Sequence, residues 1–209
     1  MSPIPRFLAI VFCLSGLSSA ATMIQPGSVS STTAQFGTYQ LNNLINKDGL
    51  SQTYVSGVTD YTTYLTLAPT QASNPLTQYA VMSDAANVTY DFDLGAAYHV
   101  TNMILWNGPA SATTRVATFS VIISNSSDFS TSQSLGSFSS SPSGAHPVAA
   151  EGFNLTAADG RYIRMVTTNA GGARTLIGEV AFAGTAVPEP SSALLVAFGT
   201  AGLLRRRRR

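Results

Sequence analysis

Two aspartates that alternate along one stretch of the chain are the first candidates for chemistry. Asp91 and Asp93 lie in Val88–Leu94, where apolar and polar residues alternate with the period of a half-buried strand. Two carboxylates on one strand face lie about 6.6 Å apart, which overlaps the spacing of an inverting glycosidase pair. Acidic residues are ordinary on the wet face of a strand, however, and nothing in the sequence would raise one pKa selectively. The pattern therefore does not predict an enzyme.

The histidines give no stronger sign of catalysis or metal binding. His99 and His146 occupy turn-like contexts, with no serine or cysteine nucleophile motif beside them and no metal-ligand spacing between them. We expect both to be solvated. Trp106, the only tryptophan, has apolar neighbours and is predicted to lie in the core.

A sugar site would need an aromatic face beside convergent hydrogen-bonding groups, on loops at one end of the fold. Six residues on or beside predicted loops could supply these groups: Tyr61, Tyr64, Asn107, Arg115, Asn169 and Arg174. Tyrosines of β proteins are more often half-buried packing residues, and this alternative stays open.

The charges are segregated along the chain. The formal net charge of the 209 residues is +1, but six arginines lie in the terminal segments, at Arg6 and Arg205–Arg209. Between Ala21 and Val187 there are five basic and nine acidic residues, a net charge of −4. A mildly acidic body without a basic stripe argues against nucleic-acid binding.

The elements that must position these residues are short strands. Alternating or apolar runs predict strands at 38–43, 62–67, 88–94, 100–106, 119–123, 135–138, 148–155, 161–168 and 177–182. Turns are predicted at Gly95–Ala97, Gly108–Pro109 and Ala158–Gly160. Val100–Trp106 is apolar on nearly both faces, so we expect it to be covered from two sides. With no helical periodicity, the pattern predicts an all-β fold, a single jelly-roll β-sandwich over residues 21–186.

The first 20 residues have the pattern of a signal peptide. Arg6 precedes an apolar run, Phe7–Leu17, and Ser18-Ser19-Ala20 supplies small residues before a cleavage point. The run is too short to span a bilayer, although an uncleaved anchor remains the alternative. The only cysteine, Cys13, would leave with this segment, so the exported protein would contain no disulfide.

The last segment, residues 187–209, has three features in fixed order. Pro188-Glu189-Pro190 is followed by an apolar run, Ser191–Leu204, and then by Arg205–Arg209. The arginines would stay in the cytoplasm and leave the body outside. A helix of this run reaches only about 21 Å, against a hydrocarbon core of about 30 Å. The segment is a poor permanent anchor but an adequate transient one.

This order of features resembles the PEP-CTERM sorting signal. The resemblance implies that an exosortase in the inner membrane of a Gram-negative bacterium recognises the tail. The membrane would hold the precursor transiently, and the processed protein would then reach the cell surface or the extracellular matrix. An ordinary C-terminal anchor is the alternative interpretation.

The body resembles a second family. YDFDLGAAYHVTNMILWN, RVATFSVIIS and GRYIRMVTTNAGGARTLIGEVAFAG, in this order between Leu41 and Gly184, are similar to F5/8 type C (discoidin) domains. These share the galactose-binding-like jelly roll with family 32 carbohydrate-binding modules. The resemblance implies a carbohydrate ligand but fixes no sugar-binding residue, since the binding loops of the family vary.

The same resemblance implies a structural Ca²⁺ site, the only cofactor expected. In the family, a loop near the domain start carries an aspartate and, five residues on, a threonine, and a glutamate in the last strand completes the site. Here the side chains are those of Asp48, Thr53 and Glu179, and the carbonyls are those of Ile45, Leu50 and Gly178. Calcium takes six to eight oxygen ligands. The alternative is an ordinary turn at Asp48-Gly49 and an edge-strand carboxylate.

Three hypotheses of function remain open from the sequence. The first is an exported surface or matrix protein that binds carbohydrate, with the surrounding exopolysaccharide as partner. The second is a structural matrix protein of the same fold without a ligand. The third, a glycan-active enzyme, lacks a catalytic constellation and ranks last, because fold alone establishes no activity.

Overall fold

The structure is a computed structural model that describes residues 20–72, 75–82, 87–109, 113–142 and 145–188. The predicted signal peptide and most of the sorting segment lie outside these residues. No helix of the described part is long and apolar enough to cross a bilayer. The elements are β1 Thr22–Ile24, β2 Ser28–Ser30, η1 Leu41–Leu44, α1 Tyr61–Thr66, β3 Thr70–Gln71, α2 Pro75–Gln78, β4 Ala80–Met82, β5 Asn87–Asn107, β6 Val116–Ser124, β7 Gln133–Ser139, β8 Val148–Asn169 and β9 Thr175–Ala186.

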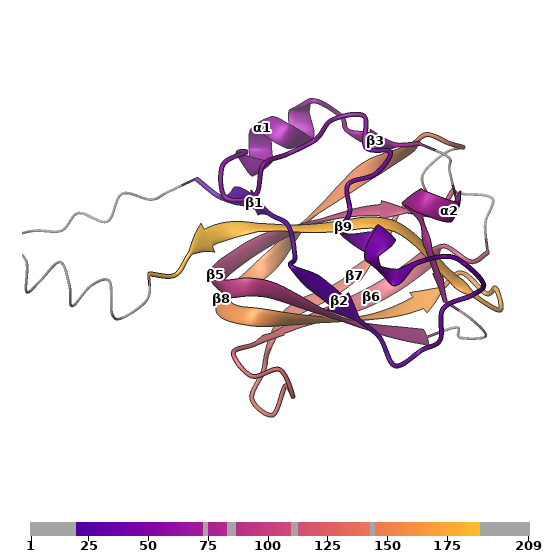
Figure 1. The fold of residues 1–209 in the computed structure, drawn as a ribbon. Helices are drawn as coiled ribbons and strands as arrows, with labels where there is room; N and C mark the ends of the chain where they lie inside the picture. The colour runs from indigo at the N-terminus through magenta and orange to yellow at the C-terminus, as the bar shows by residue number, and fades with distance from the viewer. Residues whose placement is uncertain (1–19, 73–74, 83–86, 110–112, 143–144, 189–209) are drawn as a thin grey trace, which may run out of the picture.

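Two long antiparallel strands, β5 and β8, join the layers of a β-sandwich (Figure 1). The strand order is β1-β9-β5-β8-β6-β7, with β2 beside β5, β3 beside β8 and β4 beside β9. The first half of β5 lies between β2 and β8, and its second half lies between β9 and β8. Every pairing between these strands is antiparallel. The predicted all-β sandwich is confirmed.

Two predicted turns are bends inside these long strands. Gly95, with φ of 83°, lies where the β5–β8 register shifts between Asp93 and Tyr98. Gly160 pairs with Tyr98 across this bend. The turn prediction was therefore wrong at both places, because a glycine within a strand also marks a bulge or bend that redirects it.

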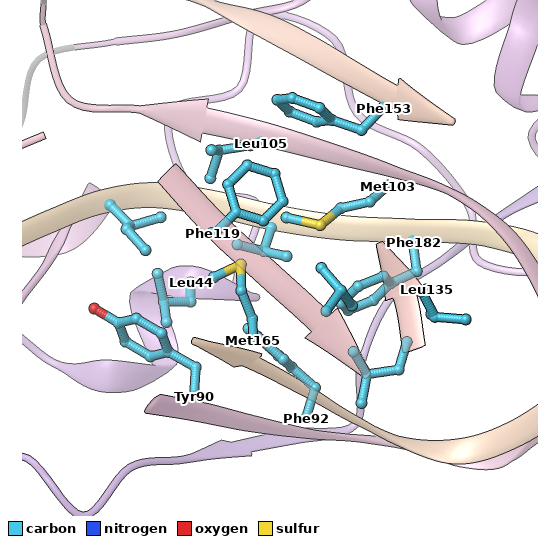
Figure 2. Packing of buried hydrophobic residues seen from close by; sticks show 14 of the residues in the cluster. Leu44, Tyr90, Phe92, Met103, Leu105, Phe119, Leu135, Phe153, Met165 and Phe182 are labelled. Atoms are coloured by element: carbon cyan, nitrogen blue, oxygen red, sulfur yellow. The ribbon is translucent and has the colours of Figure 1, made fainter. Parts of the chain in front are cut away.

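The main core lies between the two layers. Figure 2 shows Phe119, Leu135 and Met165 beside Met103, Leu105 and Phe182. Phe153 belongs to the same cluster. Phe92 packs edge-on against Phe182, with ring centroids 5.4 Å apart. Offset or edge-on contacts between rings add to the stabilisation that burial provides.

A second apolar cluster covers the outer face of the β9–β5 layer. Ile104 and Trp106 point into it, whereas Met103 and Leu105 point into the main core. All four side chains are fully buried. The second half of β5 is therefore covered from both sides, as its continuous apolar sequence predicted, and Trp106 is a core residue.

Two short helices lie where strands were predicted: α1 covers the second cluster, and η1 packs against the main core through Leu44. Residues 62–67 belong mainly to α1, and part of the predicted strand at 38–43 is the 3₁₀ helix η1. Asp60 caps α1, since its Oδ1 accepts the N–H of Thr63 at 2.7 Å. Tyr61 and Tyr64, three residues apart, then share one helix face and pack inward.

Candidate functional site

Four of the six predicted sugar-binding residues meet at one end of the sandwich. Asn107 ends β5, Arg115 precedes β6, and Asn169 ends β8. Val116 pairs with Asn169, whose Nδ2 donates to the carbonyl of Arg174 at 2.8 Å. The structure thus brings together residues from two connections, β5–β6 and β8–β9, as expected for a loop-built site.

Asn107 and Asn169 are nevertheless occupied by the fold itself. Asn107 Oδ1 accepts the N–H groups of Gly108 and Val116 at 2.8 and 2.9 Å, and its Nδ2 donates to the Val116 carbonyl at 2.7 Å. Asn169 Nδ2 also donates to the carbonyl of Gly172 at 2.8 Å. Both side chains are buried. Their amides hold the loops in shape and are not free to bind a ligand.

The two arginines at this end keep part of their surface exposed. The guanidinium of Arg174 lies over the ring of Phe36, with Cζ 3.5 Å from the ring centroid. Arg115 Nη1 donates to the carbonyl of Val116 at 3.4 Å. The buried Nε atoms of both arginines have no hydrogen-bond partner among the described residues. Arg115 and Arg174 are the members of the predicted set that could contact a ligand here.

Tyr61 and Tyr64 lie elsewhere, in the second apolar cluster. Tyr64 is 1% exposed, its ring packs edge-on against Trp106 at 6.3 Å, and its hydroxyl donates to the carbonyl of Gln52 at 2.8 Å. Burial raises the pKa of both tyrosines. These tyrosines are packing residues and offer no ring face to solvent.

The two aspartates of the first half of β5 form ion pairs with arginines of β8. Asp91 receives bonds of 2.7 and 2.8 Å from Nε and Nη2 of Arg164, and Asp93 receives bonds of the same lengths from Arg161. The bond from Arg161 lowers the pKa of Asp93. A glycosidase acid needs a raised pKa instead. The geometry gives these carboxylates a structural role.

The histidines do not share a site. His99 Nδ1 lies 2.6 Å from Asp159 Oδ1, and His146 Nδ1 lies 3.1 Å from the hydroxyl of Tyr79. Both histidines are exposed. Within the described residues, no group of three or more histidine, cysteine, aspartate or glutamate side chains is arranged to hold a metal ion.

One of the predicted cation residues, Glu179, is a buried carboxylate that contacts the segment 45–53. Glu179, on β9, is fully buried, and its Oε2 accepts the N–H of Lys47 at 3.0 Å. Its Oε1 has no hydrogen-bond partner among the described residues. Asp48 and Thr53 are exposed on the facing segment, and the Ile45 carbonyl accepts Gln25 Nε2 at 2.6 Å.

Burial raises the pKa of Glu179 to about 8. The bond from the Lys47 N–H and the positive charge of Lys47 oppose this shift, whereas the nearby carboxylate of Asp48 adds to it. An ionised carboxylate in this position destabilises the folded protein unless a positive charge or further hydrogen-bond donors reach it.

Gln71, which the sequence did not single out, lies beside Gly178, the residue before Glu179. Its Nε2 donates to the carbonyl of Gln78 at 2.8 Å, while its buried Oε1 has no partner within the described residues. Gly178 leaves the space that Gln71 Oε1 occupies, since a Cβ there would overlap this oxygen. Two buried acceptor oxygens without partners therefore lie beside adjacent residues of β9. Amide and carboxylate oxygens are the kind of ligand that a hard cation such as Ca²⁺ takes.

Comparison with known proteins identifies the tail and the fold. Residues 186–209 match the family model of the PEP-CTERM protein-sorting motif. No curated protein is significantly similar to the chain. The sandwich is similar to the family 32 carbohydrate-binding module of C. perfringens NanJ, solved with galactose, with a TM-score of 0.54 and 11% identity over 78% of this chain and 98% of that chain.

Two structures of AlyQ give the same result. Its family 32 module, solved with 4,5-unsaturated mannuronic acid, has a TM-score of 0.52 and 19% identity over 77% of this chain and 96% of that chain. A truncated AlyQ with the module and alginate lyase domains has a TM-score of 0.54 and 19% identity; 82% of this chain matches only 35% of that one. At these identities the likeness shows a shared fold, the jelly roll of carbohydrate-binding modules.

Proposed function

We propose that this chain, which carries a PEP-CTERM protein-sorting motif, is an exported surface or matrix protein whose sandwich binds carbohydrate. One observation supports the sorting half above all: the matched motif begins at Ala186, the last residue of the last strand. The signal peptide is removed after Ala20, an exosortase processes the tail near Pro188-Glu189-Pro190, and the body remains outside the cell. The partner in the matrix is the exopolysaccharide.

The arrangement of the ends suits this route. β1 pairs with the end of β9, Thr22 opposite Gly184, so the described ends of the chain leave the same end of the sandwich (Figure 1). The N–H of Val187 donates to the carbonyl of Ala97 at 3.1 Å, which ties the start of the motif to the bend of β5. The loops that carry Asn107 and Asn169 lie at the other end, where β9 begins.

Carbohydrate binding is supported by the fold that the chain shares with modules solved with sugars. The competing proposal is a matrix protein of the same fold that has no affinity for glycans. Hydrolysis has less support, since Arg161 and Arg164 occupy the carboxylates of Asp93 and Asp91. We propose that the sandwich binds glycans without cleaving them.

We further propose that a structural Ca²⁺ connects the segment 45–53 to β9. Glu179 Oε1 and Gln71 Oε1 supply two ligands, and the carbonyls of Ile45, Leu50 and Gly178 supply others. Asp48 and Thr53 lie on the same segment and add side-chain oxygens. The cation would provide charge neutralisation for Glu179 and no catalytic step.

Two measurements test the proposal. Intact mass of the protein recovered outside the cell should show neither the first 20 residues nor Arg205–Arg209; a species that retains these arginines would contradict processing. Retention on polysaccharide from the same cells should exceed retention of an unrelated sandwich protein of similar charge. Equal retention would favour the structural matrix protein.

A further inference from the structure

The outer face of the β7-β6-β8-β5 layer carries a regular array of hydroxyl groups. Along one row across the strands, the paired residues are Ser139, Thr118, Thr168 and Asn87. The next row contains Ser137, Ser120, Val166 and Thr89. Neighbouring strands lie about 4.8 Å apart, so each row spans roughly 14 Å, and the rows are about 6.8 Å apart.

A groove of about 330 Å³ follows these rows over β6, β7 and β8. Its volume lies at the lower end of the range for small-ligand sites, about 300–1,000 Å³. The hydroxyls of Thr118, Ser120, Ser137 and Ser139 form no hydrogen bond with any other described residue, whereas Thr168 Oγ1 donates to Asn87 Oδ1 at 2.8 Å. The groove thus presents hydroxyl groups that can donate and accept.

Apolar surface lies among these hydroxyls. Val166 is 39% exposed in the middle of its row. Phe138 alternates with Ser137 and Ser139 along β7, so its ring points away from the groove and packs against the main core, 5.4 Å from Phe119 and 5.5 Å from Phe153. The groove thus combines hydroxyl groups with one exposed aliphatic side chain, that of Val166.

No charged side chain lines the groove. The nearest charges along these strands belong to Asp91 and Arg164 in the following row, and they neutralise each other in a two-bond pair. An anionic polymer would find no cation in the groove, and a cationic one no free carboxylate. The complementary ligand is therefore uncharged and rich in hydroxyls.

We infer that this groove, rather than the loops at the end of the sandwich, binds a neutral polysaccharide chain across strands β7, β6 and β8. The inference rests on the proposed carbohydrate binding and adds its place and the class of ligand. It differs from the prediction from sequence, in which the sugar would be contacted by Tyr61, Tyr64, Asn107, Arg115, Asn169 and Arg174. The residues that carry it are Thr118, Ser120, Ser137 and Val166.

The test is affinity electrophoresis of the secreted protein in gels that contain galactomannan or dextran as neutral polymers, or alginate as an anionic one. Ser137→Arg should fill the groove and weaken binding to a neutral polymer at least about tenfold, or about 1.4 kcal/mol. The double variant Thr118→Val, Ser120→Ala should weaken it severalfold while it keeps the groove open. Gln133→Arg, on the same strand with the same added charge, should migrate as wild type.

The outcomes separate this inference from the proposed function. If Ser137→Arg binds polysaccharide as wild type does, or if Arg115→Ala or Arg174→Ala loses binding instead, the groove is not the binding site. Carbohydrate binding by the protein would still be supported. Preferential retardation of wild type by alginate would overturn the neutral ligand. No retardation by any polymer, including the cells' own polysaccharide, would overturn both. Circular dichroism of each variant, expected to match wild type, confirms that the fold is retained.

Discussion

The stability of the cation-free protein should fall as pH rises through the neutral range, because of Glu179. Burial raises the pKa of this carboxyl from an ordinary 4.5 to about 8. The folded state therefore holds a proton that the unfolded chain releases near pH 4.5. The stabilisation from Glu179 is fully present below pH 4.5 and is lost as pH rises to about 8.

The size of the effect follows from this shift. A change of pKa from 4.5 to about 8 corresponds to about 5 kcal/mol at 1.36 kcal/mol per unit. This value is an upper limit, since water and the Lys47 ammonium can reach a carboxylate that ionises. For a domain of this size, 1 kcal/mol corresponds to about 3 °C, so the melting temperature should fall by up to about 15 °C.

The proposed Ca²⁺ would bind the ionised carboxylate and should reverse this loss. We expect Ca²⁺ to raise the melting temperature strongly at pH 8.5 and weakly at pH 5, since proton and cation compete for Glu179. Glu179→Gln should be more stable than wild type at pH 8.5 in chelator and insensitive to Ca²⁺. Glu151→Gln, a change at a carboxylate that accepts the Ser141 N–H, is the matched control and should behave as wild type.

Differential scanning calorimetry of the secreted protein at both pH values, with Ca²⁺ or with chelator, measures all four conditions. A wild-type melting temperature that is equal at pH 5 and pH 8.5 in chelator would refute the buried, neutral Glu179. A calcium response that survives in Glu179→Gln would refute this residue as a ligand, whatever the pH dependence.

Three further predictions concern the fold. Asp93→Asn should lower the free energy of unfolding by about 1 kcal/mol at pH 7, because it removes the partner of Arg161. Since the pKa of Asp93 is lowered in the folded protein, this loss should vanish as pH falls below the ordinary value of 3.8. An equal loss at about pH 2 would refute the role of the ion pair. Gly184→Ala should lower the free energy of unfolding, measured in urea, by about 2 kcal/mol, since its Cβ would overlap the carbonyl of His99. A change below about 0.5 kcal/mol would show that β9 and β5 can move apart to make room. Asn107→Ala should cost about 2–4 kcal/mol and leave glycan binding of the folded protein intact; lost binding at unchanged stability would contradict its structural role.

Alternation of apolar and polar residues predicted most strands, because a strand that buries one face carries apolar side chains at every second position. Phe119, Val121 and Ile123 of β6 point into the core as expected. The continuity of β5 could not be predicted, since Gly95 has the same local signature in a turn and in a bend. The helix α1 was missed because six residues give too few turns for a period, although Asp60 marks its start.

For the predicted sugar-binding residues, sequence indicated a loop position better than it indicated the bonds that their side chains form. Asn107 and Asn169 do lie at the loop end, yet sequence could not show that backbone groups already occupy their amides. Gln71 has no sequence signal, because only the fold brings it beside Gly178. The hydroxyl groove depends on strand register, which aligns residues as distant as Thr118 and Ser139.

The position of the groove relative to the sorting motif leads to a last prediction. Ala186 pairs with Tyr98, which pairs with Gly160 of β8. Thr168, at the far end of the groove, is eight residues further along β8, or about 27 Å. The precursor held at the membrane through its tail should therefore keep the groove accessible.

Precursor in membrane vesicles and the processed protein should accordingly bind a neutral polysaccharide with affinities within about twofold of each other, as sedimentation with labelled galactomannan would measure. A site at the bend of β5, next to Val187, would instead be shielded by the bilayer. Binding that appears only after processing would place the ligand at that end and remove it from the groove.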